Sequence, residues 1–307
     1  RGRPTTASEL PTMLRNSSAG PFSDGSCPIS ADLHMHTLHS HGQAATEAMF
    51  RAARAKGLAI IGFSEHSPRP AGYAYPADYQ AKLVREFPQY VAEVRQIAAE
   101  ASAENIRVLL GMEVDYLPGQ EAYAKALIEA YDFDYVIGGL HFQKNWGFDF
   151  SAEDWVLMTK DERFAAYAQY YRDLAAMCQS GLFHIAAHPD LVKLFTVENF
   201  QAWLATDEAA PLIRNALTAM KDNNMAMEIS SAGLRKPCKE IYPCRRVMDL
   251  ARELRLPVSF GSDAHCVNTP AFAFDVLARY AGEYGYTHST VIEQGRPRRH
   301  SFAGAAK

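Results

Sequence analysis

The sequence alternates short apolar runs with longer segments of helical periodicity, and this alternation constrains the fold more than any other feature. Residues 58–63, Leu-Ala-Ile-Ile-Gly-Phe, form a continuous apolar run that is typical of a strand covered on both faces. The preceding segment, 46–57, has the spacing of an amphipathic helix and ends at a glycine. Further strands are predicted over 32–36, 106–111, 135–139, 183–187, 225–229 and 257–261. Further helices are predicted from 79 to about 103 and over 120–131, 161–180, 208–223 and 243–254.

Seven strands that alternate with helices predict βαβ units, and therefore an α/β protein with a parallel sheet. The number is one short of eight and favours a barrel over an open doubly wound sheet. After the last strand we expect a helix over about 271–284 and an extended tail over 287–292. Residues 1–30 are rich in Pro, Gly, Ser and Thr, and we interpret them as an irregular N-terminal arm with a short apolar patch at 10–14.

Composition narrows the class of protein. A chain of 307 residues with 48% hydrophobic and 21% charged residues can bury a large core. Its formal charge of −4 offers no general attraction to nucleic acid or to anionic lipid, so an anionic substrate needs local positive charge or metal. The five cysteines include no C-x-x-C pair, which argues against a disulfide framework or a zinc knuckle.

No apolar run approaches the ~18 residues of a membrane span, and the start lacks the pattern of a secretory signal. With reduced cysteines, these features predict a soluble cytoplasmic protein with no membrane partner. The residues carry no pattern that predicts an oligomeric state.

Histidine and acidic side chains occur where the predicted strands end. In Asp32-Leu33-His34-Met35-His36, an extended backbone places His34 and His36 on the same face, about 7 Å apart at the Cα atoms. In a parallel barrel the carboxyl ends of all strands open on one rim, where reacting groups collect. The candidate metal ligands on this rim are His34, His36, His41, His66, Glu113, His141, His188, Asp263 and His265.

Taken singly, each of these residues has an ordinary explanation, such as a capping histidine or a buried carboxylate paired with an arginine. Together they place seven of the eleven histidines on one predicted rim. Nine donors exceed the needs of one four-coordinate zinc and suit two or three divalent ions. Imidazole with carboxylate suits Zn, Mn, Fe or Co.

Several segments resemble the polymerase and histidinol phosphatase (PHP) superfamily, and more narrowly its stand-alone histidinol-phosphate phosphatases. The segments are His34-x-His36, His41-Gly42, Ser64-Glu65-His66, Gly111 to Asp115, Gly139 to Phe142, His188-Pro189-Asp190 and Gly261 to His265. Residues 228–236 and Trp146-Gly147-Phe148-Asp149 narrow the similarity to the phosphatase branch.

The resemblance runs from about Ala31 to Arg299, and it implies a PHP metal-dependent phosphatase domain over 31–307 with a distorted seven-stranded, TIM-like barrel. It also implies a trinuclear metal site. The first metal would take His34, His36, Glu113 and Asp263; the second would take Glu113, His141 and His188; the third would take His41, His66 and His265.

For such an enzyme we hypothesise that a metal-bound hydroxide attacks the phosphorus of histidinol phosphate directly, giving histidinol and phosphate. Arg235 is the first candidate to bind the phosphate and Arg69 the second, because a guanidinium matches phosphate oxygens; Lys144 and Lys236 are weaker candidates. Asp263 or His265 could protonate the leaving alkoxide. The candidates to bind the substrate ammonium are Glu228, Asp115, Tyr73 and Trp146.

The sequence does not exclude two other functions. The first is a PHP phosphatase or phosphodiesterase for another small phosphorylated metabolite or nucleotide. The second is a metal-stabilised scaffold without catalysis. Such a protein would be expected to lack some of the metal ligands listed above, and none of them is missing. A nucleic-acid partner is disfavoured by the acidic balance and by the absence of a basic stripe.

Overall fold

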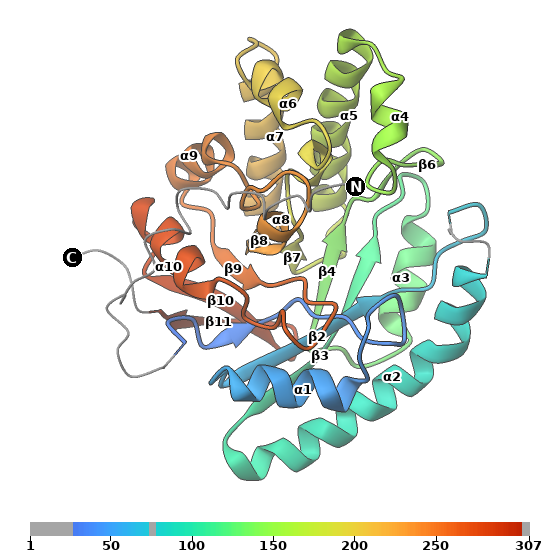
Figure 1. Cartoon of the computed structure of the whole chain (residues 1–307), viewed down its shortest axis with the longest axis vertical. Coiled ribbons are helices and arrows are strands. Elements are labelled where there is room, and N and C mark those ends of the chain that lie inside the picture. The colour runs from blue at the N-terminus through green and yellow to red at the C-terminus, as the bar shows by residue number, and fades with distance from the viewer. Residues whose placement is uncertain (1–26, 74–77, 303–307) are drawn as a thin grey trace, which may run out of the picture.

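The computed structural model describes residues 27–73 and 78–302. Strands and helices alternate as predicted, and the helices lie around the outside of the central sheet, α1 and α2 on one side and α5 and α7 on another (Figure 1). The sheet strands are β1 (Ala31–Asp32), β2 (Ile60–His66), β3 (Arg107–Asp115), β4 (Tyr135–Gly139), β7 (Ile185–Ala186), β8 (Ala226–Ser230) and β9 (Val258–Gly261). All of the paired neighbours run parallel, in the order β1-β2-β3-β4-β7-β8-β9.

The helices are close to the predicted ranges. They are α1 (Thr46–Ala55), α2 (Tyr79–Ala101), α3 (Glu121–Glu129), α4 (Ala152–Val156), α5 (Lys160–Gln179), α6 (Val197–Leu204), α7 (Ala209–Asp222), α8 (Ala232–Arg235), α9 (Arg245–Leu254) and α10 (Phe274–Glu283). Short 3₁₀ turns cover Ser102–Glu104 and Leu191–Lys193. The short helices α4, α6 and α8 and a small hairpin, β5 (Phe142–Gln143) with β6 (Trp146–Gly147), were not predicted, because each is too brief to show a period.

The two outer strands of the sheet meet and close the barrel. Leu33 N donates to Phe260 O (3.2 Å), His36 N donates to Ala264 O (2.8 Å), and Ala264 N donates to His34 O (3.2 Å). These bonds join the chain after β1 to β9 and to the residues that follow it. The predicted distorted seven-stranded barrel is therefore confirmed, although β1 is shorter than the predicted strand 32–36.

The barrel interior is filled by its own apolar cluster. Its members are Ala31, Leu33, Ile60, Leu109, Tyr135, Ile137, Ile185, Ala187, Ala226, Val291 and Ile292. The Tyr135 hydroxyl donates to Leu33 O at 2.7 Å. A Cβ at Gly62 or Gly111 would collide with the Tyr135 side chain, so these two glycines provide the space that the ring occupies.

The chain after the last barrel helix differs from the prediction. Instead of a single extended tail it forms a hairpin of β10 (His288–Glu293) and β11 (Arg296–Ser301), joined at Gln294 and Gly295, which both have positive φ. Strand β11 is polar and largely exposed, so it lacks the alternation that would have revealed it. Val291 and Ile292 of β10 complete the barrel interior.

All five cysteines lie within the described residues and are free, as their spacing indicated. Among the described residues, no helix combines the length and the apolar character that a membrane crossing requires. The predicted N-terminal arm, 1–30, lies almost wholly outside the described residues.

Candidate metal centre

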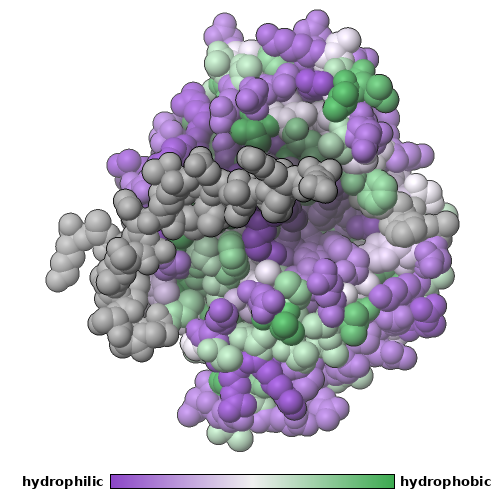
Figure 2. Space-filling model, in the orientation of Figure 1, coloured by the Kyte–Doolittle hydropathy of each residue, from purple (hydrophilic) through white to green (hydrophobic). Residues whose placement is uncertain are grey.

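A cavity of about 300 Å³ lies at the carboxyl ends of the barrel strands. Figure 2 shows hydrophilic residues around the hollow in the middle of this face of the molecule. The residues that line the cavity are His41, His66, Arg69, Tyr79, Glu113, His141, Asp149, Phe150, His188, Lys236, Asp263 and His265. Seven of the nine predicted ligands are in this set, and the other two, His34 and His36, are fully buried in contact with it.

Glu113 lies at the centre of the predicted ligands, near the carboxyl end of β3, and it is 1% exposed. Its two carboxylate oxygens face imidazole nitrogens from four other strands or the loops that follow them. The neighbours of Oε2 are His34 Nε2 (3.2 Å), His36 Nε2 (3.3 Å) and His66 Nδ1 (3.2 Å), and those of Oε1 are His188 Nε2 (3.1 Å) and His141 Nε2 (3.6 Å). A carboxylate in this position can bridge ions on its two sides.

The remaining ligands complete overlapping groups. Three sets have ligand atoms within 4.8 Å of one another: His34, Glu113 and His188; His34, His36 and Asp263; His36, His66 and His265. The His41 ring lies 4.3 Å from the His265 ring, at the exposed mouth of the cavity. The structure thus brings all nine side chains into one cluster.

The protonation of this cluster follows from burial and close charge. Burial disfavours a charged His36, but Asp263, Glu113 and Glu65 outweigh burial and raise its pKa to about 10. Burial and the charge on His36 hold the pKa of His66 and of His265 well below the usual value. Burial alone would raise the pKa of Glu113, but the surrounding histidines lower it well below its usual value. The cluster therefore contains ionised carboxylates, the neutral imidazoles of His66 and His265, and the protonated imidazole of His36, which would release its proton on binding a metal.

Some ring nitrogens of the cluster make no hydrogen bond, and their positions indicate whether these residues could hold a metal ion. His265 Nε2 is buried and makes no hydrogen bond with any described residue, and His66 Nδ1, although it lies 3.2 Å from Glu113 Oε2, is not aligned with it for a hydrogen bond. Both belong to the group that also contains His36. Buried polar atoms without a partner are costly, and a shared cation satisfies neighbouring ones together. The donor set of imidazole and carboxylate therefore fits divalent ions.

Three further carboxylates contact the second ring nitrogen, Nδ1, of three candidate ligands and orient their rings. Glu65 Oε1 lies 3.2 Å from His36 Nδ1, Glu228 Oε1 lies 2.6 Å from His34 Nδ1, and Asp115 Oδ1 forms a short contact with His141 Nδ1. Such partners fix the ring orientation and the tautomer of a ligating histidine.

These contacts correct one expectation. Glu228 and Asp115 were candidates to bind a substrate ammonium, but both are buried and already engaged. Glu228 also accepts from His188 N at 2.7 Å, and Asp115 is paired with Arg69. The sequence offered one signal, since Glu228 is the only charged residue in the apolar run 225–229. Of the other two candidates, neither Tyr73 nor Trp146 is among the cavity-lining residues.

Replacing Glu228 by Gln is expected to weaken zinc binding by about 10- to 100-fold, because mutation of a residue that hydrogen-bonds a metal-ligating histidine typically lowers metal affinity by this factor. Glutamine keeps the shape but loses the charge opposite His34 Nδ1. Zinc titration by calorimetry measures the change. The exposed carboxylate variant Glu253→Gln serves as the control, and equal zinc affinities in the two variants would contradict the assignment.

The positions of the cationic residues near the cavity differ from the order in which the sequence ranked them as phosphate-binding candidates. Lys236 lines the cavity and lies 2.8 Å from Asp263 Oδ2. Arg69 also lines it, with its Nε bonded to Asp115. Arg235, the first candidate for phosphate, is not among the lining residues; its Nη2 donates to the carbonyls of Ser262 and of Asp263. Arg235 therefore holds the backbone after β9.

The two candidate proton donors are adjacent. The Nδ1 of His265 donates to Asp263 O at 2.9 Å, which leaves Nε2 facing the cluster. The carboxylate of Asp263 is ionised, since Lys236 and neighbouring histidines, opposing burial, hold its pKa well below the usual value.

Comparisons of the sequence and of the fold with known proteins point to the same family. The family model described as PHP domain matches residues 32–232. A Deinococcus radiodurans protein named as a probable histidinol-phosphatase is 33% identical over 247 residues, which covers 79% of this chain and 89% of that protein. The Bacillus subtilis histidinol-phosphatase is 25% identical over 290 residues, covering 86% and 98%.

Among solved structures, the histidinol phosphate phosphatase of Lactococcus lactis, in complex with zinc, L-histidinol and phosphate, superposes with a TM-score of 0.70. The identity is 20%, over 88% of this chain and 98% of that chain, so this likeness concerns the fold. With the family model matching about two thirds of the sequence, this chain belongs to the PHP domain family.

Proposed function

We propose that this chain is a metal-dependent phosphomonoesterase that hydrolyses L-histidinol phosphate to L-histidinol and phosphate. The observation that carries the proposal is the convergence of nine imidazole and carboxylate ligands in a cavity that also contains cationic side chains. The choice of histidinol phosphate is supported by the names of the relatives from Deinococcus radiodurans and Bacillus subtilis. The free cysteines support action in the cytoplasm.

Two or three divalent ions are the proposed cofactors, held by His34, His36, Glu113 and Asp263, by Glu113, His141 and His188, and by His41, His66 and His265. When bound, such ions neutralise phosphoryl oxygens and activate water for attack on phosphorus. Zinc is the first ion to test, with manganese, iron and cobalt as alternatives.

The chain's own residues have separate proposed roles around the substrate. Lys236 and Arg69 face the cavity and are the proposed partners of the phosphate, because both are cations beside the ligand cluster. Arg235 would act on phosphate only indirectly, through the backbone carbonyls that it binds. The choice of proton donor stays open between Asp263 and His265, because Asp263 is ionised and paired with Lys236, and His265 is neutral with its ring proton bonded to Asp263 O.

The variant Lys236→Met is expected to raise KM for the substrate and the inhibition constant of inorganic phosphate by roughly 10-fold or more, since a hydrogen bond to a charged group contributes about 1.5–3 kcal/mol. Steady-state kinetics measure both constants. Lys144→Met is the matched control, because Lys144 is exposed and does not line the cavity. Equal constants for the two variants would remove Lys236 from the phosphate site.

A panel of phosphoesters tests the function itself. Protein loaded with zinc or manganese is assayed with histidinol phosphate, a generic aryl phosphate, a nucleoside monophosphate and a phosphodiester. We expect kcat/KM to be highest for histidinol phosphate. A value no better than that for the aryl phosphate would discard this substrate, and no hydrolysis of any ester would discard the phosphatase.

A further inference from the structure

A completely buried lysine lies one turn away from a candidate metal ligand. Lys193 ends the 3₁₀ turn Leu191–Lys193 that follows His188, and its side chain has no exposure to solvent. The ammonium has three acceptors: Asp190 Oδ2 at 2.8 Å, Glu240 Oε2 at 3.1 Å and Ile241 O at 2.9 Å. An ammonium has three N–H donors, so all of its hydrogen-bonding capacity is used.

On one side Lys193 holds the turn that presents His188. His188 has a left-handed backbone, with φ of 25°, which is unfavourable for a residue with a side chain. Its carbonyl accepts from Leu191 N at 2.9 Å and from the Tyr170 hydroxyl at 3.1 Å. The pair of Asp190 and Lys193 closes this turn from its other end.

On the other side Lys193 holds the loop between α8 and α9, residues 236–244. This loop begins at Lys236, which faces the candidate active site. Its later part is bound from the inside, where Lys193 reaches Ile241 O and Asp190 Oδ2 accepts from Cys244 N at 2.7 Å. The ammonium also lies 5.2 Å above the Tyr242 ring.

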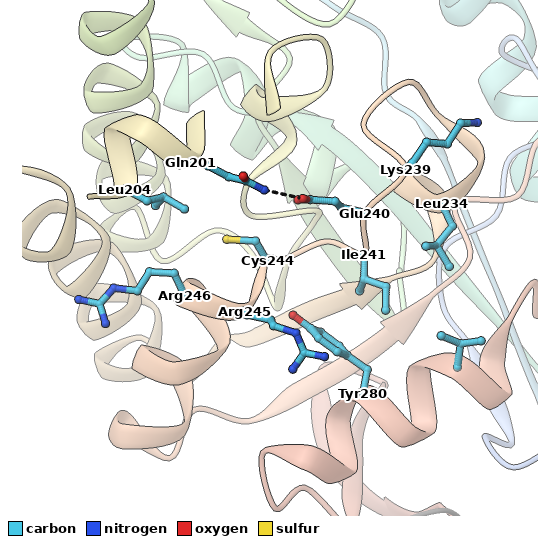
Figure 3. A pocket seen from close by; sticks show the side chains of 11 residues that line it. Gln201, Leu204, Leu234, Lys239, Glu240, Ile241, Cys244, Arg245, Arg246 and Tyr280 are labelled. Carbon is cyan, nitrogen blue, oxygen red and sulfur yellow. Dashed lines mark hydrogen bonds between the residues drawn. The ribbon is translucent and has the colours of Figure 1, made fainter. Parts of the chain in front are cut away.

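The outer side of the same loop faces open space. A second cavity of about 360 Å³ lies there, and Glu240, Ile241 and Cys244 form part of its wall (Figure 3). The only bond drawn across this cavity joins Gln201 to Glu240. The Tyr280 hydroxyl, which lines this cavity, donates to Pro243 O at 2.8 Å, and the backbone of Tyr242 pairs with that of Ser230. The contacts to Lys193 and Asp190 are the part of this constraint that joins the loop to the turn of His188.

Stability alone is a poor reason for this arrangement. Removing charges from water is costly, and apolar residues of similar size often stabilise a protein as well as a buried ion pair does. Burial opposes the charged form of Lys193, but the nearby carboxylates outweigh it and raise its pKa above the usual value, so the side chain carries its charge.

We propose that Lys193 is a positioning residue, which fixes the turn of His188 relative to the loop that begins at Lys236 and so keeps the metal-binding and phosphate-binding sides of the cavity in register. This inference rests on the proposed function, because it assigns metal binding to one segment and phosphate binding to the other.

Two variants of the full chain separate positioning from folding. Lys193→Met leaves the buried Asp190 and the partly exposed Glu240 without their cation, so it is expected to lower the unfolding midpoint. The triple variant Lys193→Met, Asp190→Asn, Glu240→Gln removes the unpaired charges and is expected to recover much of that loss. Lys221→Met, an exposed lysine of α7, is the matched control.

The readouts are zinc affinity, the affinity for inorganic phosphate of the zinc-loaded protein, and KM and kcat for histidinol phosphate. We expect both variants to bind zinc and phosphate about 10-fold more weakly than the control, even where the triple variant is as stable as the parent. A triple variant that recovers these affinities together with stability would overturn the inference, as would one that does not fold.

If the proposed function is wrong, these experiments give a different result. A parent protein that binds zinc and phosphate but does not hydrolyse histidinol phosphate contradicts the substrate assignment, while the binding readouts still decide the role of Lys193.

Discussion

Treatment of the purified full chain with a chelator is expected to lower kcat/KM for histidinol phosphate by about 10³-fold or more. The reason is that cations contribute several kcal/mol of charge stabilisation in phosphoryl transfer, and each 1.4 kcal/mol is about tenfold in rate. The chain's own cations at the cavity, Lys236 and Arg69, are already paired with Asp263 and Asp115, so they cannot replace the metal charge.

Stability should fall with activity. Ions that bind only the folded state at about 1,000 times their Kd stabilise it by about 4 kcal/mol, and their loss would lower Tm by roughly 8 °C in a chain of this size. Metal analysis, calorimetry and activity are measured on the same samples before and after the ions are returned. Full activity in a sample that contains no divalent metal would contradict the assignment.

The substitution Glu113→Gln is expected to lower kcat/KM by about 10³-fold and to reduce the number of ions bound per chain. Glu113 contacts ligands on both sides of the cluster, and a neutral amide donates where a second oxygen would accept. The loss corresponds to about 4 kcal/mol of transition-state stabilisation. Kinetics with excess zinc and metal analysis after dialysis measure the two effects.

The control for this variant is Glu129→Gln, which changes an exposed carboxylate on α3 that is paired with Lys125. The control should keep the parent's activity and metal content. If Glu113→Gln bound as many ions as the control and lost less than tenfold in activity, the central role of Glu113 would be wrong.

Much of the barrel could be predicted because its signals are local. Strand β4 lies at its predicted residues, 135–139, and α5 lies within one residue of its predicted ends. Continuous apolar runs and helical periods are visible within a few residues of sequence. The hairpin partner β11 was missed because it is exposed, and it therefore shows no apolar pattern.

The candidate ligands could be predicted for a related reason. Once parallel strands form a barrel, every carboxyl end is on one rim, so residues such as His66 and Glu113 must be neighbours. The positions of longer side chains could not be predicted in the same way. Arg235 and Lys236 are adjacent in sequence, but only Lys236 lines the cavity, and Arg235 binds backbone carbonyls instead.

The sequence by itself determined the alternation of strands and helices, the barrel, and the set of imidazoles and carboxylates on its rim. Only the tertiary structure decided the pairing of those groups, such as His34 with Glu228, which are 194 positions apart. The physical reason is that a strand's period specifies the face on which a side chain lies, whereas its partner depends on how separate strands align and how the barrel closes.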